Sequence, residues 1–227
     1  YTAQALIGTP FAADSDLNCL SLLSAENVSY TLADRTEGIA TPIRIPSDTI
    51  GGVRYRYYYQ GQPPRVFDCR LALALARAAP VLRANGVTEV IYLSHYRPSF
   101  GLLPKGGYHY HAQGLAIDVK GFRVGKGVVI DIARDYERGL GEQEPQSCLG
   151  RPMTRRGMLL RQIVCDLDEA DAFFAILTPD YDEAHWHHFH LSAFHPAQRS
   201  RLRPKQTALM EVPMEALPPW ALSRSLH

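Results

Sequence analysis

Apolar residues recur at helical spacing in three segments of the chain, residues 16–25, 69–86 and 153–167. Apolar side chains three or four residues apart are typical of a helix that buries one face. The middle segment, CRLALALARAAPVLRANG, is the best core helix, because Asp68 precedes it as a capping residue and Gly86 ends it. We expect Pro80 to kink this helix. Its shared apolar face consists of Leu71, Leu75, Ala78 and Leu82.

Strands are expected where β-branched and aromatic residues alternate with polar ones. This pattern occurs in residues 53–60, 87–93, 115–119, 122–132 and 185–194, the fourth of these as a hairpin turning at residues 125–127. Helical and strand patterns together predict one α+β domain. We assign residues 1–202 to it, with residues 1–52 as an N-terminal extension packed on it, and residues 203–227 to a tail that contains four prolines.

Composition agrees with a globular protein and excludes several classes. The 227 residues are 46% hydrophobic and 21% charged, which is enough to bury a substantial core. A formal net charge of +1 gives no reason to expect a nucleic-acid partner. No apolar run approaches the roughly 20 residues of a transmembrane helix, so we expect no transmembrane segment.

The four cysteines stand apart in the sequence, without a CxxC pair of the kind that binds structural zinc. An even number suits two disulfides in an oxidising compartment, and Cys148 with Cys165 is the first pair to consider. The alternative is four buried thiols in a reducing compartment.

Candidate chemistry concentrates in two segments, HYHAQGLAID (residues 109–118) and HWHHFH (residues 185–190). In a strand alternate side chains share a face, so His188 and His190 would serve one site while Phe189 points to the core. His111, Asp118 and His190 then offer two imidazoles and a carboxylate. This set suits catalytic zinc, because it leaves a fourth position for water. Taken singly, a histidine or aspartate at such a position is more often a surface or hydrogen-bonded group, so the prediction depends on the joint pattern.

HAQGLAID resembles the HxxGxAxD motif of the superfamily of D-Ala-D-Ala metallopeptidases, murein endopeptidases and Hedgehog proteins, and HWHHFH resembles its HxxHxH motif. Over most of residues 17–195 the chain is similar to the bacterial extensin-like C-terminal domain. This resemblance implies a small, mainly antiparallel sheet flanked by helices. It also implies one Zn²⁺ held by His111, Asp118 and His190, with His188 as a catalytic histidine assisted by His185.

The stretch SHYRPS resembles the SGYRS stretch of these peptidases, which implies that Arg97 contacts the substrate. A structural salt bridge is the alternative role for Arg97. The chain departs from the family pattern at His109, where a serine is usual, and at Glu183, which lies seven residues before His190. His109, Glu183 and His187 are therefore accessory candidates, and Glu183 is a reserve candidate for the base.

The resemblance implies a zinc-dependent hydrolase that cleaves peptide bonds in peptidoglycan stem peptides or cross-links. Such a protein is expected to be exported, to the bacterial periplasm, the cell envelope or the medium. The alternative is a non-catalytic, zinc-containing binding module of the same fold, in which His109 is the fourth ligand. A closed set of four protein ligands is typical of structural zinc, and an open position is typical of catalytic zinc.

Overall fold

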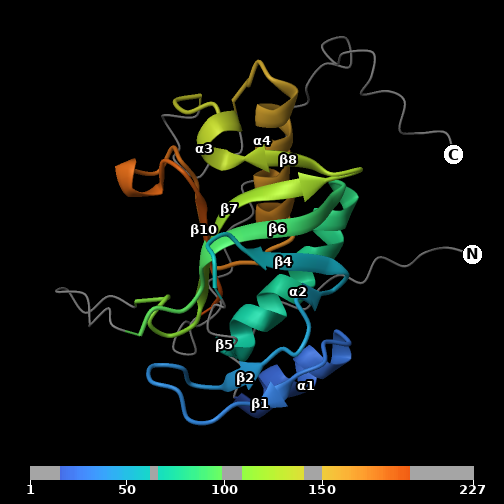
Figure 1. Cartoon of the computed structure of the whole chain (residues 1–227), viewed down its shortest axis with the longest axis vertical. Coiled ribbons are helices and arrows are strands. Elements are labelled where there is room, and N and C mark those ends of the chain that lie inside the picture. Colours follow the sequence, from blue (N-terminus) through green and yellow to red (C-terminus); the bar gives the residue numbers. More distant parts are fainter. Residues whose placement is uncertain (1–15, 62–65, 99–108, 141–149, 195–227) are drawn as a thin grey trace, which may run out of the picture. The chain divides into compact units, whose positions relative to one another are not determined.

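A mixed β-sheet organises the fold (Figure 1). The computed structural model describes residues 16–61, 66–98, 109–140 and 150–194. Within these ranges seven strands form the sheet in the order β3-β4-β6-β7-β10-β9, and β8 pairs with β7. The strands are β3 (Thr49–Ile50), β4 (Val53–Tyr57), β6 (Val87–Ser94), β7 (Ala116–Val124), β8 (Val128–Asp131), β9 (Ala175–Leu177) and β10 (Phe189–Ser192).

The strand pairs of this sheet are antiparallel except for β4 and β6, which run parallel. A parallel pair needs a long crossover, and helix α2 (Cys69–Ala84) supplies it between β4 and β6. A second sheet of three short antiparallel strands, β1 (Thr31–Leu32), β2 (Pro42–Arg44) and β5 (Val66–Asp68), lies at the start of α2.

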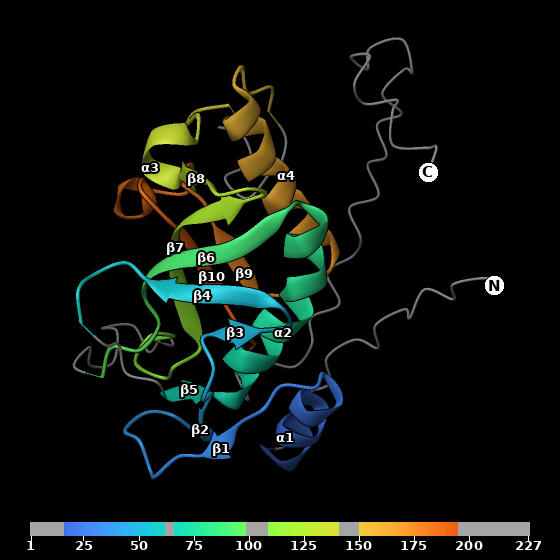
Figure 2. The ribbon, with the colours of Figure 1, turned by 45° about the vertical axis from the view of Figure 1, so that its right-hand side comes forward.

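Among the described residues four helices flank the sheets, and Figure 2 shows α2 and α4 beside the larger sheet. They are α1 (Asp16–Ala25), α2, α3 (Ile132–Asp135) and α4 (Arg155–Glu169). Helix α2 begins as predicted, because the Asp68 carboxylate accepts a hydrogen bond from the Arg70 backbone N–H. It ends just before Gly86, whose φ of +75° is the left-handed conformation that terminates helices.

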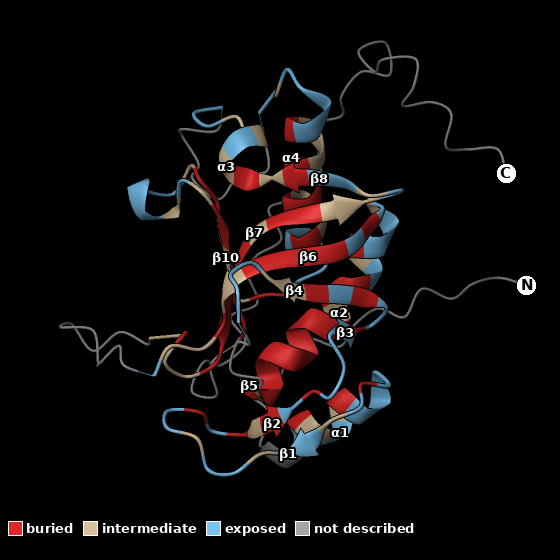
Figure 3. Ribbon diagram, viewed as in Figure 1, coloured by how far each residue is buried: buried red, intermediate tan, exposed pale blue. Residues whose placement is uncertain are grey.

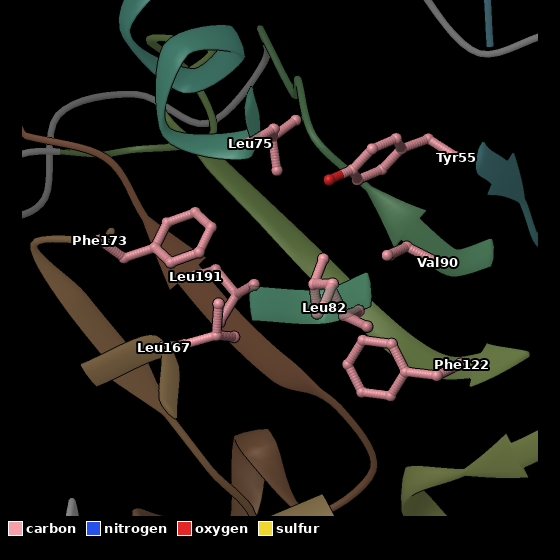
Figure 4. A pocket seen from close by; sticks show the side chains of 9 residues that line it. Tyr55, Leu75, Leu82, Val90, Phe122, Leu167, Phe173 and Leu191 are labelled. Atoms are coloured by element: carbon pink, nitrogen blue, oxygen red, sulfur yellow. The ribbon is translucent and has the colours of Figure 1, made fainter. Parts of the chain in front are cut away.

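The core lies between α2, α4 and the sheet face toward them, where the buried segments gather (Figure 3). A small apolar cavity of about 10 Å³ remains there. Figure 4 shows the Tyr55 hydroxyl pointing into it from β4. That hydroxyl is buried without a hydrogen-bond partner in the part of the chain that the structure describes. The side chains around the cavity are Tyr55, Leu75, Leu82, Val90, Val119, Phe122, Leu167, Phe173 and Leu191.

The predicted α+β class is confirmed, and two strand predictions are corrected. Residues 115–119 and the first arm of the 122–132 hairpin form one continuous strand, β7, which changes partner along its length. The strands β7 and β8 approach closely at Gly121, where a Cβ would lie 2.2 Å from the Ile130 carbonyl oxygen. The strand expected over residues 185–194 begins only at Phe189. Asp182 caps a 3-10 helix, η1 (Glu183–His185), which takes up the preceding residues.

A disulfide joins Cys19 of α1 to Cys69 at the start of α2, with the α-carbons 6.2 Å apart. No sequence pattern indicated this pairing, because 50 residues separate the two cysteines. Cys165 is also disulfide-bonded. Cys148, the partner suggested for it, lies outside the described residues, as do residues 1–15 and the predicted tail.

Candidate metal centre

Three neighbouring strands place a row of polar side chains on the sheet face opposite the core. In the register of β6, β7 and β10, Asp118 is the direct partner of Ser94 on one side and of His190 on the other. The flanking residues Ile117 and Val119 are buried, as the alternation of a strand requires. Antiparallel pairing therefore brings Asp118 and His190, which are 72 residues apart, side by side.

His111 reaches the same place from the turn that precedes β7. The Gly114 N–H donates to the His111 carbonyl, and so does the Arg97 N–H. Gly114 has a φ of +65°, and a Cβ there would lie 2.9 Å from Ile39 Cδ1. This position therefore needs glycine both for its backbone conformation and for its close approach to the neighbouring loop.

The three predicted ligands converge. His111 Nε2 lies 3.0 Å from Asp118 Oδ1, His190 Nδ1 lies 2.9 Å from the same oxygen, and the two nitrogens are 3.1 Å apart. Four-coordinate zinc with bonds of about 2.0–2.1 Å would space its ligand atoms by about 3.3 Å. The arrangement is thus slightly tighter than a loaded zinc site and differs from it by only a few tenths of an ångström.

The hydrogen bond on the far side of the His111 ring indicates that a nitrogen lone pair of this ring faces the centre shared by the three ligands. His111 Nδ1 lies 3.2 Å from the His95 carbonyl oxygen, which can only accept, so this nitrogen carries the proton. The neutral ring then presents an unprotonated Nε2 to the Asp118 carboxylate. Two acceptors at 3.0 Å repel each other unless a cation lies between them. The lone pairs that His111 and Asp118 present to each other therefore fit a metal ion.

Ser192 lies behind the ring of His190. Its hydroxyl Oγ lies 2.9 Å from His190 Nε2, so it can accept the proton of that nitrogen and leave the lone pair on Nδ1. Ser192 is only 2% exposed, which keeps water from replacing it.

Electrostatics favour the charge states that a metal requires. Burial raises the pKa of Asp118, but in the metal-free protein the imidazoles of His111, His188 and His190 can share a proton with the carboxylate; they outweigh the burial and hold that pKa well below its usual range. Burial lowers the pKa of His111 despite the nearby Asp118 carboxylate, so the ring is neutral at pH 7. A carboxylate and a neutral imidazole are the ligand forms that bind zinc.

The predicted catalytic histidines lie beside this set. His188 is 8% exposed, and its Nε2 lies 3.4 Å from Asp118 Oδ1. The His185 ring centroid is 5.1 Å from that of His188 and 5.7 Å from that of His190. Asp182 Oδ1 lies 2.5 Å from His185 Nδ1 and fixes that ring at the end of η1.

Arg97 is held at the site by an ion pair. Its Nη2 donates to Asp118 Oδ2 at 2.8 Å, and the Ser94 hydroxyl donates to the same oxygen at 2.9 Å. The guanidinium thus supports the metal ligand, which is the salt-bridge role considered for it. The Arg97 side chain is nevertheless 38% exposed, so a bound molecule has access to it.

Ligand atoms converge in two groups among the described residues, one of His111, Asp118 and His190 and one of His185, His188 and His190, and the accessory candidates belong to neither. His109 Nδ1 accepts a weak hydrogen bond from the Ala112 N–H at 3.4 Å and so closes its own turn. His187 packs its ring against those of Trp186 and His188. Glu183 is 83% exposed and pairs with Arg138, an unfavourable starting position for a base.

Sequence reasoning missed the residues that orient the ligands. Ser94 and Asp182 had no signal in the sequence, because a hydroxyl or carboxylate beside a strand is common. Ser192 had a signal in the strand pattern, because it lies two residues after His190 on the same face of the same strand.

Within the described ranges, no helix combines the length and the apolar character that crossing a membrane requires. Searches of curated proteins and of solved structures found no match to the chain. A family model described as extensin-like protein C-terminus matches residues 66–202. This range includes α2 and each of the three converging ligands. The chain therefore belongs to the extensin-like protein C-terminus family.

Proposed function

We propose that the chain is a zinc-dependent hydrolase of the D-Ala-D-Ala metallopeptidase and murein endopeptidase superfamily, acting on peptide bonds of peptidoglycan. The observation that carries the proposal is the convergence of His111 Nε2, Asp118 Oδ1 and His190 Nδ1 within 3.1 Å of one another. These residues would hold one Zn²⁺. When bound, zinc supplies an activated water near neutral pH and polarises the carbonyl to be cleaved.

His188 is the residue best placed to move a proton. It is buried beside Asp118, and its Nδ1 has no hydrogen-bond partner among the residues that the structure describes. An imidazole with one ring nitrogen that has no hydrogen-bond partner can take a proton and later return it. His185, turned toward His188 and held by Asp182, is placed to donate a proton to the leaving amine.

Arg97 would meet the substrate while it holds Asp118. A guanidinium forms strong, directional hydrogen bonds to a carboxylate or to a developing oxyanion. Because one nitrogen is committed to Asp118 Oδ2, the exposed part of the group is what remains for the substrate.

The peptidoglycan substrate and the export of the protein rest on the resemblance of HAQGLAID and HWHHFH to the murein endopeptidase motifs. The Cys19–Cys69 disulfide supports export, because stable disulfides belong mainly to oxidising compartments. The bacterial periplasm, the cell envelope and the medium all meet this condition.

Digestion of purified sacculi, with mass analysis of the released peptides, tests the proposal. The zinc-loaded protein should release peptides, and His188→Ala should retain equimolar zinc while losing about 10²–10⁴-fold in rate. A zinc-loaded protein that cleaves neither sacculi nor soluble muropeptides would refute the hydrolase. It would favour the non-catalytic binding module instead.

A further inference from the structure

A second set of nitrogen ligands lies next to the first. The side chains of His185, His188 and His190 each offer a ligand nitrogen, and these nitrogens lie within 4.8 Å of one another. Three imidazoles are a ligand set that binds zinc, copper and nickel ions. The set shares only His190 with the first one.

The surroundings of His185 match those of a metal ligand. Asp182 Oδ1 lies 2.5 Å from His185 Nδ1, so the carboxylate accepts the proton of that nitrogen and leaves the lone pair on Nε2. A carboxylate behind an imidazole is the usual support of a metal-bound histidine. Asp182 also caps η1, which fixes the position of the pair.

His188 gives an independent indication of a missing ligand. The residue is 8% exposed, and its Nδ1 is buried without a partner within the described ranges. If Nε2 donates to Asp118 Oδ1 at 3.4 Å, the lone pair lies on Nδ1. A buried polar atom without a partner is costly, so the His188 ring gains stability from any ligand that takes this lone pair.

We propose that His185 and His188 form a second, weaker cation site that takes a divalent transition-metal ion such as Zn²⁺. The first set keeps His190, because its Nδ1 already lies 2.9 Å from Asp118 Oδ1. The second ion is then left with two imidazoles and water, so it binds less tightly than the first. The site opens to solvent on the side of His185, whose side chain is 17% exposed.

Filling this site blocks hydrolysis, a consequence that rests on the proposed function. His185 and His188 can move protons only while their lone pairs are free. An ion that takes both lone pairs removes the proton carriers and leaves the first site intact. The protein is therefore active with one equivalent of zinc and inhibited by excess zinc.

Zinc titration of the full chain without a histidine tag, followed by competition with a chromophoric chelator, tests the site. The wild-type protein binds two equivalents in two steps. His185→Ala keeps the tight first step and loses the second, and Asp182→Asn weakens the second step alone. His187→Ala is the matched control: it removes a neighbouring imidazole that belongs to neither set, and it keeps both steps.

A single step in the wild-type protein, or a second step that persists in His185→Ala, would overturn the second site. Peptide release from sacculi, measured along the same titration, should fall as the second step fills. Two binding steps without peptide release at any zinc level would count against the hydrolase and leave the second site standing. Peptide release that does not change as the second zinc-binding step fills would overturn the proposed inhibition.

Discussion

Ser192→Ala should weaken zinc binding although Ser192 touches no metal. Ser192 Oγ lies 2.9 Å from His190 Nε2, and a hydroxyl that accepts the proton of this nitrogen keeps the lone pair on Nδ1. In the alanine variant the proton is free to move to Nδ1, where Asp118 Oδ1 accepts it at 2.9 Å. A ring in that tautomer cannot bind zinc through Nδ1, so the competent fraction of the protein falls and the apparent affinity falls with it.

The size of the effect follows from the burial of the site. At 2% exposure of Ser192, water cannot readily replace the hydroxyl. Loss of a hydrogen bond that orients a metal ligand costs about 10–100-fold in metal affinity. At about 1.4 kcal/mol per tenfold this amounts to roughly 1.4–2.8 kcal/mol.

A chelator competition assay at pH 7.5 measures this change directly. Ser192→Thr, which keeps the hydroxyl, should bind zinc within a few-fold of the wild-type protein. Ser94→Ala is a second control, because Arg97 still holds the oxygen of Asp118 to which Ser94 donates; its loss should be smaller than tenfold. Equal zinc affinities of Ser192→Ala and the wild-type protein would refute the role assigned to Ser192.

Three further predictions concern stability and pH. Tyr55→Phe should leave the free energy of unfolding in urea unchanged or raise it by up to about 1 kcal/mol, because a buried hydroxyl without a partner is unfavourable; a decrease of that size would reveal a partner. Gly114→Ala should lower the free energy of unfolding by about 1–2 kcal/mol for the left-handed backbone alone, and further for the contact with Ile39. Gly86→Ala, with a similar φ but open space around the added methyl group, should show the backbone cost only; equal losses in the two variants would contradict the packing argument. Because burial lowers the pKa of His111, its contribution to stability is complete above about pH 6.5, the unfolded value, and decreases as the pH falls below it. Unfolding of the metal-free protein at pH 7.5 and 5.5 checks this, and a His111→Gln variant should lose less stability than the wild-type protein over the same range.

The local elements were predictable where one physical signal dominated. Helix α2 has a capping aspartate, an apolar face and a terminating glycine, and the structure places its bounds at Cys69 and Ala84. Pro80 did not prevent this helix from being continuous. The short strands β1, β3 and β9 have two or three residues each and carry too little periodicity to be recognised.

The candidate site was predictable in its ligands and not in its supports. The alternation of Phe189, His190 and Leu191 placed His190 on the face away from the core, and the same rule placed Asp118 there. His188 lies beside Asp118 for a different reason from the one expected, since it belongs to the turn after η1 and not to the strand. The Arg97 ion pair and the Ser192 hydrogen bond depend on the packing of β6, β7 and β10, which no single segment encodes.

X-ray absorption spectroscopy of the protein loaded with one equivalent of zinc tests the central claim most directly. The account predicts four light ligands at about 2.0–2.1 Å, two of them imidazoles, and no sulfur. It also predicts that Asp118→Ala and His190→Ala each lose equimolar zinc while the protein stays folded. A sulfur ligand, a shell without imidazole, or full retention of zinc in both variants would contradict the assignment of His111, Asp118 and His190 as the metal site.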